Sequence, residues 1–322
     1  MAKIKTRSTE SRRQKPLVVT PRDKTHTHTV ILLHDAGAKG RDAGRKFLKA
    51  TNIQSHFPTV RFVFPCAFKA PPAVKNGPSG ATQWFNNPSW PSPRWAGDTA
   101  TLPETAVFLQ RLIHSEARLL RDNGDYGLHA AYGRVVVGGL SHGGAAALLY
   151  LLGSHRPLGG FLGIGALLPW KYQLELLLEM YEDGFGRRKA IVGTNYVRDL
   201  LQFERLAVGN EGYRSCESLK DAEKDNRESR MPAWQYPLIH LNTPAFLGHG
   251  SQPEKENSMG RCLSGIFGMD VIDIDCTEHG KEWYSVPEAF EHVLSFLEQR
   301  VGIHRASMDE TSSTSKTERK VI

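Results

Sequence analysis

The stretch VVVGGLSHGGAAALLY, residues 135–150, decides the fold. The β-branched run Val135–Val137 predicts a buried strand, and the small residues after position 143 predict a helix. Between them, GLSHG (139–143) matches the pattern G-x-S-x-G. A strand, a tight turn and a helix in direct succession predict a nucleophile elbow, with Ser141 on a strained turn at the head of the helix. A glycine-rich turn that contains a serine by chance is the simpler alternative, and the additional Gly144 favours the elbow.

A serine at such a turn needs three further groups before it can attack an acyl carbonyl, namely an oxyanion hole, a histidine base and an acid that orients the base. The N–H of His142, directly after the nucleophile, is the expected first donor of the hole. The N–H of Ala36, in the turn after the first clear strand, is the expected second. The His142 side chain is expected to line the site, because a base should arrive from across it. His34 precedes Ser141 in the chain, whereas the order in this fold is serine, acid, histidine, so a structural role is expected.

Strand and helix signals alternate along the rest of the chain, which predicts βαβ units, a mainly parallel sheet and an α/β-hydrolase fold. The expected strands are residues 27–37, 60–65, 158–169, 243–250 and 269–275, and the expected helices are residues 102–122 and 287–300. The chain is long for one domain, but α/β folds of this size often remain single. We therefore expect one hydrolase domain over residues 25–302.

Residues 171–235 interrupt this alternation with two apolar helical segments and the charged run SLKDAEKDNRESR. Active sites of open α/β sheets lie at the carboxyl edge of the sheet, so an insertion there is a candidate lid. A helical hairpin remote from the site is an equally good interpretation.

The net charge of +7 is concentrated in one segment. Residues 1–24 hold eight Lys and Arg against two acidic residues, so the rest of the chain is nearly neutral. A basic arm could make weak contact with an anionic membrane or serve as a nuclear address, but a solvated disordered tail is the simpler expectation. No nucleic-acid-binding motif accompanies it, so no nucleic-acid partner is expected. The polar residues 303–322 predict a second disordered tail.

Composition indicates a globular protein, with 40% hydrophobic and 23% charged residues. No apolar run is long enough to span a membrane, and no secretory signal is recognisable at the start of the sequence. Four scattered cysteines without a C-x-x-C pair predict reduced thiols and a cytoplasmic location, with the nucleus as an alternative.

Several motifs together resemble one family. In chain order they are residues 16–37, 62–68, 83–90, 135–153, 158–170 and 243–256. This series is similar to the acyl-protein thioesterase and phospholipase/carboxylesterase family of α/β-hydrolases, especially its fungal branch. The resemblance implies hydrolysis of carboxylic esters or thioesters of acyl chains without a metal or an organic cofactor. It implies that Trp84 and Phe85 lie near the acyl pocket, although ordinary core packing explains an aromatic pair equally well. Family members usually carry glutamine where this chain has His142.

The family's acid and base positions differ in this chain. The acid position, counted from His249-Gly250, holds Pro253, and Glu254 is the nearest carboxylate. The base position, read without a gap, holds Glu282, and His279 is the nearest histidine in the same loop. We therefore expect His279 as base and Glu254 as its orienting acid. The alternative is a degenerate hydrolase that binds acyl ligands or a protein without efficient turnover.

Overall fold

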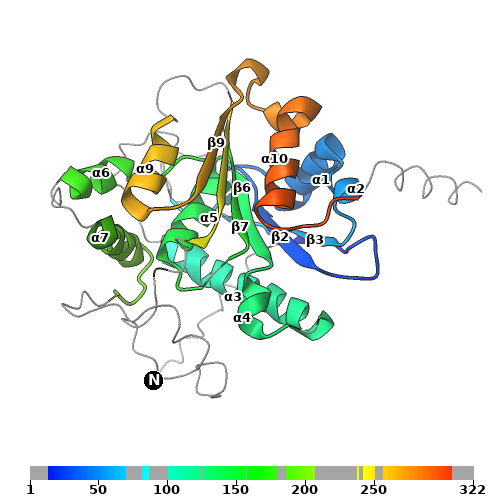
Figure 1. Cartoon of the computed structure of the whole chain (residues 1–322), viewed down its shortest axis with the longest axis horizontal. Helices are drawn as coiled ribbons and strands as arrows, with labels where there is room; N and C mark the ends of the chain where they lie inside the picture. Colours follow the sequence, from blue (N-terminus) through cyan, green and yellow to red (C-terminus); the bar gives the residue numbers. More distant parts are fainter. Residues whose placement is uncertain are drawn as a thin grey trace, which may run out of the picture.

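A computed structural model of the chain describes residues 14–69, 82–86, 101–124, 126–156, 158–179, 186–206, 238, 242–250 and 257–306. Within these residues, seven strands form one sheet in the order β1-β3-β2-β6-β7-β8-β9, and two short strands form a separate hairpin. Helices cover both faces of the sheet, as Figure 1 shows. The α/β architecture expected from the sequence is confirmed.

The strands of the main sheet are short, and all except β1 and β9 at its two edges are largely buried. They are β1 (Leu17–Val19), β2 (His28–Leu33), β3 (Val60–Phe64), β6 (Val135–Leu140), β7 (Gly160–Ile164), β8 (Ala245–His249) and β9 (Val271–Asp275). Strands β2, β6, β7 and β8 show no exposed residue, which explains their continuous apolar sequences. The hairpin consists of β4 (Phe68–Lys69) and β5 (Thr82–Gln83).

All pairings in the main sheet are parallel except that of β1 with β3. The register aligns Leu140 with Ile164, and Ile164 with Gly248. The residues that follow β6, β7 and β8 therefore emerge together at the carboxyl edge of the sheet. In open α/β sheets this edge is where ligands bind.

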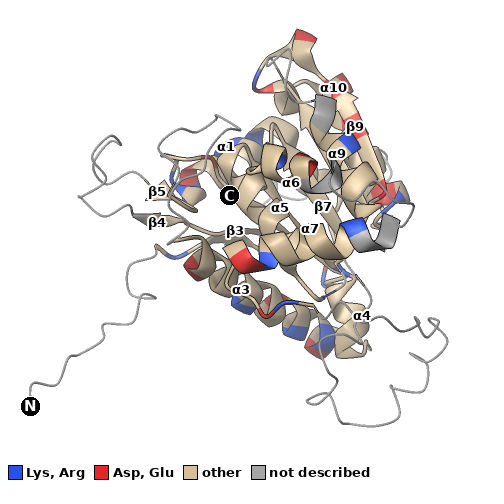
Figure 2. Cartoon of the chain, turned by 90° about the vertical axis from the view of Figure 1, so that its left-hand side faces the viewer, with Lys and Arg blue, Asp and Glu red and all other residues tan. Residues whose placement is uncertain are grey.

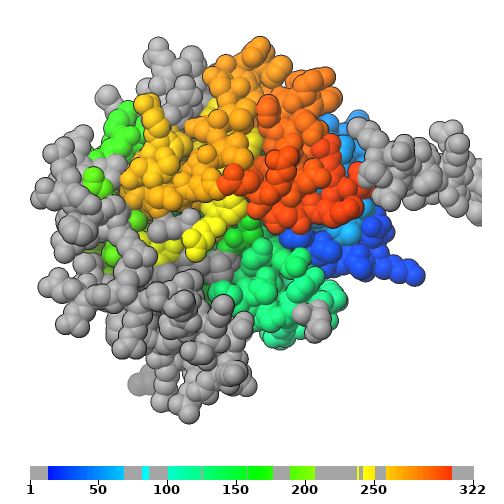
Figure 3. Space-filling model, in the orientation of Figure 1, coloured from blue at the N-terminus to red at the C-terminus, as the bar shows by residue number. Residues whose placement is uncertain are grey.

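One face of the sheet is covered by α1 (Gly40–Thr51), α2 (Ile53–His56) and α10 (Pro287–Gln299). Their core side chains include Phe47, Ile53 and Phe290. Figure 3 shows the C-terminal residues, in orange and red, beside the blue N-terminal strands, and the Ala306 N–H donates to the His56 carbonyl at 2.9 Å. The two ends of the described chain are thus packed on the same side of the molecule.

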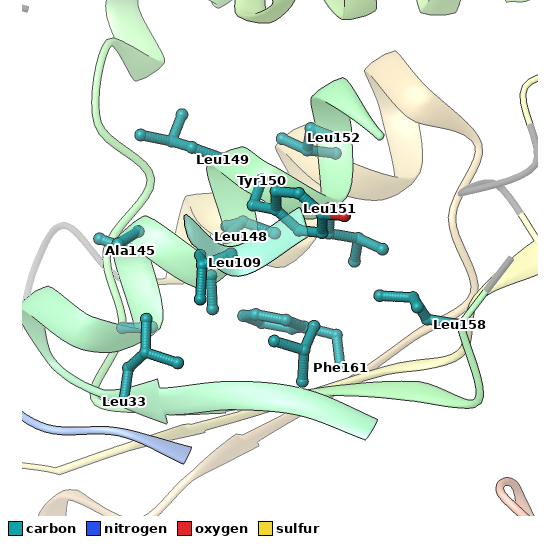
Figure 4. Packing of buried hydrophobic residues seen from close by; sticks show 14 of the residues in the cluster. Leu33, Leu109, Ala145, Leu148, Leu149, Tyr150, Leu151, Leu152, Leu158 and Phe161 are labelled. Carbon is teal, nitrogen blue, oxygen red and sulfur yellow. The ribbon is translucent and has the colours of Figure 1, made fainter. Parts of the chain in front are cut away.

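The other face carries α3 (Leu102–Asn123), α4 (Leu128–Tyr132), α5 (His142–Gly153), α6 (Lys171–Glu179), α7 (Gly186–Leu200) and α9 (Asn257–Phe267). Helix α5 is the centre of this layer, because every one of its residues is buried. Figure 4 shows its leucines and Tyr150 in one buried cluster with Leu109 of α3 and Phe161 of β7. Helix α3, in contrast, has an outer face of mixed charge (Figure 2). The elbow helix is therefore held rigidly from all sides.

Two predicted boundaries are wrong. Strand β1 lies inside the segment 1–24 that was expected to be a tail, because Leu17–Val19 can pair with the edge of β3. The expected tail at 303–322 also begins too early, since Ile303 is buried in the core. Residues 1–13 and 307–322 lie outside the described residues.

The described part of the 171–235 insertion forms two helices that belong to the core. Leu174 of α6, Val197 of α7 and Leu201 are buried in the cluster around α5. Both helices contact α9, and α7 also contacts α5. The charged run SLKDAEKDNRESR lies outside the described residues, so a lid in that part of the insertion stays a prediction.

Candidate active site

Ser141 occupies a strained turn between β6 and α5. Its backbone angles are φ 47° and ψ −113°, in the positive-φ region that non-glycine residues rarely adopt. Its N–H donates to the Ile164 carbonyl at 2.9 Å, and its carbonyl accepts from Ala145 at 3.0 Å. The turn is thus fixed to β7 on one side and to its own helix on the other. Backbone strain of this kind is typical of a functional residue.

Two glycines make the turn possible because backbone atoms approach them closely. A Cβ on Gly139 would lie 2.6 Å from the Leu33 carbonyl oxygen. A Cβ on Gly143 would lie 2.5 Å from the carbonyl oxygens of both Leu33 and His34. The elbow and the end of β2 are therefore in direct backbone contact. This contact brings the turn after β2 to the nucleophile.

The two N–H groups expected to form the oxyanion hole converge on one oxygen atom. The Ala36 N–H donates to Asp35 Oδ1 at 2.7 Å, and the His142 N–H donates to the same atom at 3.2 Å. A pair of amides that share one acceptor is the arrangement that an oxyanion hole requires. The acceptor here is the chain's own carboxylate.

His34 holds this turn in place, which is the structural role expected for it. The Ala67 N–H donates to His34 Nε2 at 3.0 Å, so Nδ1 carries the proton and donates to the Asp35 carbonyl at 2.7 Å. The Trp84 indole N–H donates to the His34 carbonyl at 2.8 Å. Burial lowers the pKa of His34. A neutral imidazole with both nitrogens engaged is a support for the turn rather than a base.

Phe85 and His142 pack against each other beside the nucleophile. Their rings are stacked with centroids 4.1 Å apart, and both side chains are fully buried. Burial is the main cause that lowers the pKa of His142 to about 3. Such an imidazole is too weak a base for the reaction at neutral pH. Trp84 is also fully buried, in the cluster under α5, and the assignment of Trp84 and Phe85 to the acyl pocket stays a prediction.

The loop after β9 holds both candidates for the base position. His279 ends the short 3₁₀ helix η5 (Thr277–His279) and is exposed. Among the described residues, none hydrogen-bonds to the imidazole of His279 or to Ser141 Oγ. Glu282 forms an ion pair with Lys46 of α1, and this contact raises the pKa of Lys46. The carboxylate at the family's base position is therefore used to link the loop to α1.

The expected acid, Glu254, and its neighbour Pro253 lie outside the described residues. A histidine–carboxylate pair that was not predicted lies on β8 and β9. His249, at the end of β8, is buried, and its Nε2 is 2.9 Å from Asp273 Oδ1 on β9. The sequence holds no local signal for this pair, because only the pairing of β8 with β9 brings the two residues together. No hydrogen bond joins either residue to Ser141, and the pair ties the last two strands together.

A separate cavity of about 240 Å³ lies at the other end of α5, lined by Gln110, Arg111, His114, Tyr132, Tyr150 and Arg156. It does not include Ser141. The described residues contain no group of three His, Cys, Asp or Glu side chains that could hold a metal ion. None of the helices in this described part of the chain is long and apolar enough to cross a bilayer.

The sheet, the elbow and the paired amides define an α/β-hydrolase. The model of the phospholipase/carboxylesterase family matches residues 14–179, and the chain belongs to that family. The matched part contains Ser141 and both amides of the expected oxyanion hole, and it ends before Glu254 and His279 in the sequence.

Relatives and solved structures agree with this family. Acyl-protein thioesterase 1 of Cryptococcus neoformans var. neoformans is 29% identical over 204 residues, which are 59% of this chain and 77% of that protein. Acyl-protein thioesterase 1 of Yarrowia lipolytica is 31% identical over 157 residues, 48% of this chain and 64% of that protein. The crystal structure of Zea mays acyl-protein thioesterase 2 superimposes with a TM-score of 0.54 at 18% identity, covering 89% of this chain and 99% of that one.

Proposed function

We propose that the chain is a serine hydrolase that cleaves carboxylic esters or thioesters of acyl chains. The observation that carries this proposal is the convergence of the Ala36 and His142 amides on one oxygen beside the strained Ser141. Two donors aimed at one point stabilise the charge of a tetrahedral intermediate, which is commonly the largest contribution to acyl transfer. The family and its thioesterase relatives support the substrate class.

In the proposed reaction, Ser141 Oγ attacks the acyl carbonyl carbon, and His279 accepts the hydroxyl proton. Glu254 orients His279. The carbonyl oxygen becomes an oxyanion held by the amides of Ala36 and His142. Collapse of the intermediate breaks the ester or thioester bond, and the leaving alcohol or thiol takes the proton from His279. Water then attacks the acyl-enzyme, which releases the carboxylic acid and restores Ser141. The proposed compartment is the cytoplasm.

A second candidate function is favoured by the contact of Glu282 with Lys46. A carboxylate engaged in an ion pair at the family's base position cannot take the serine proton. If His279 does not replace that base, the protein is a degenerate hydrolase that binds acyl ligands or a protein partner. Loss of one triad member typically lowers turnover by a factor on the order of 10⁴, because only the hole and substrate binding then contribute.

Labelling with a fluorophosphonate probe separates the two candidates. We expect wild type to label, Ser141→Ala not to label, and His279→Ala to label slower by a factor on the order of 10³ or more. His292→Ala is the matched control, because His292 is an exposed histidine on α10. It should label as wild type does.

The opposite pattern would support the degenerate hydrolase. In that case wild type does not label, and the double variant Pro253→Asp with Glu282→His gains labelling that depends on Ser141. Labelling of wild type that survives His279→Ala removes this histidine from the mechanism and leaves the nucleophile in place.

A further inference from the structure

The side chain of Asp35 lies where the substrate oxyanion would be held. Its Oδ1 accepts hydrogen bonds from both amides of the hole, at 2.7 Å from the Ala36 nitrogen and 3.2 Å from the His142 nitrogen. Both donors are therefore engaged in the structure described. The acceptor carries a negative charge, as the tetrahedral intermediate would, so it resembles the species that the hole is built to bind.

This contact follows from a rigid backbone and a short side chain. The Asp35 carbonyl is fixed by the His34 imidazole, and the His34 carbonyl by the Trp84 indole. With the backbone fixed, the Asp35 carboxylate needs only its own short side chain to reach the neighbouring Ala36 amide. Asp35 is exposed, so a rotation of its side chain moves the carboxylate into solvent and frees the two amides without a change in the core.

We propose that Asp35 is an internal competitor that restrains the reactivity of Ser141 until a ligand displaces it. This inference rests on the proposed function. Hydrogen bonds to a carboxylate are stronger than those to a neutral ester carbonyl, so a substrate carbonyl competes poorly for the same two donors. A carboxylate next to the reaction centre also repels the negative charge that develops on the substrate. Asp35 thus acts on the hole in two ways, by occupancy and by charge.

The occupancy can be measured without any catalysis. An amide proton that donates to a carboxylate resonates downfield in a proton–nitrogen correlation spectrum. In Asp35→Ala, the signals of Ala36 and His142 should both move upfield. Asp35→Asn keeps an oxygen acceptor but not the charge, so both amide signals should move upfield by less than in Asp35→Ala. Asp42→Asn on α1 is the matched control, since Asp42 is exposed and contacts Arg45 outside the site. It should leave both signals unchanged.

The restraint is measured by the rate of Ser141 labelling with the fluorophosphonate. Loss of one donor of an oxyanion hole costs about 10²–10³ in rate, so freeing both donors should speed labelling at least about tenfold in Asp35→Ala. Asp35→Asn should fall between this variant and wild type, and Asp42→Asn should match wild type. Thermal unfolding of each variant shows that the fold is retained.

The two measurements distinguish failure of the Asp35 inference from failure of the proposed function. Unchanged amide signals in Asp35→Ala, or equal labelling of Asp35→Ala and wild type, overturn the inference and leave the proposed function standing. If no variant labels, the proposed function fails, and the amide signals alone then uphold or overturn the occupancy of the hole by Asp35.

Discussion

At the scale of single residues, the elbow depends on two backbone contacts that no side chain can replace. Gly143, in the first turn of α5, lies against the carbonyl oxygens of Leu33 and His34, where a Cβ would lie at 2.5 Å from both. We predict that Gly143→Ala lowers the free energy of unfolding by about 2 kcal/mol or more, because the end of β2 must move away from α5. Urea unfolding followed by circular dichroism measures the change.

Gly265 of α9 provides the matched control, because a Cβ there meets nothing within 4 Å. Gly265→Ala should stabilise the protein by about 0.5–1 kcal/mol, as expected for a helix position with free space. Equal effects of the two variants would contradict the role assigned to Gly143. The comparison isolates the close approach at the elbow from the general effect of alanine in a helix.

At the same scale, the sequence was informative where chemistry restricts the residue type. The strained turn at Ser141, between a strand and a helix, was predictable because a strand, a G-x-S-x-G turn and a helix admit few alternatives. The side chain of Asp35 was not predicted as the acceptor, because its contact with His142 depends on how β2 and β6 align. The pair of His249 and Asp273 was missed for the same reason.

At the scale of elements, buried strands and long amphipathic helices were predictable from their apolar periodicity. Helix α3, Leu102–Asn123, differs from its expected range by one residue at its end. Strand β1 was missed because three residues, two of them only partly buried, give almost no pattern. Helix α9 was missed because its sequence, NSMGRCLSGIF, holds two glycines and two serines, and its burial comes from packing against α7 and β9.

The packing of α6 and α7 predicts how much the described part of the insertion contributes to the stability of the domain. Leu201 is 1% exposed and lies against the helix end at Gly153, whereas Leu176 on α6 is 58% exposed. We predict that Leu201→Ala lowers the free energy of unfolding by about 2–4 kcal/mol, because it leaves a cavity in the cluster around α5. Leu176→Ala should change it by less than about 0.5 kcal/mol. Urea unfolding measures both, and a Leu201→Ala variant as stable as Leu176→Ala would show that these helices do not support the domain.

At the scale of the whole molecule, stability should depend on pH through buried and partly buried histidines. Burial is the main cause that lowers the pKa of His26, His28 and His155 to about 4, and that of His142 to about 3. Nearby arginines contribute, namely Arg61 for His26, Arg134 for His28 and Arg156 for His155. In the unfolded chain these groups return to the ordinary value of 6.5. Unfolding at mildly acidic pH therefore takes up protons.

The sign of the effect follows from which state binds more protons. Between pH 6.5 and the folded pKa values, the unfolded state binds more, so stability rises with pH and falls as the solution is acidified. We predict that the free energy of unfolding is constant between pH 7.5 and 8 and falls steadily from pH 6.5 to pH 5. The Thr277 N–H lowers the pKa of Asp275, and Arg305 lowers that of Glu291. These two carboxylates lose their stabilising effect only at a pH below this window. A series of urea midpoints at constant ionic strength measures the slope.

The variant His142→Gln makes the prediction specific to one residue. Glutamine does not titrate, so the slope between pH 6.5 and 5 should be smaller than in wild type by up to about 1.4 kcal/mol per pH unit, the value for one proton. Between pH 7.5 and 8 the difference in stability between the two proteins should not depend on pH, because the histidine is neutral in both states. An unchanged slope in the variant would mean that His142 takes up a proton in the folded protein as readily as in the unfolded chain. Its imidazole, stacked on Phe85 beside Ser141, would then have to be reconsidered as a group that takes part in proton transfer.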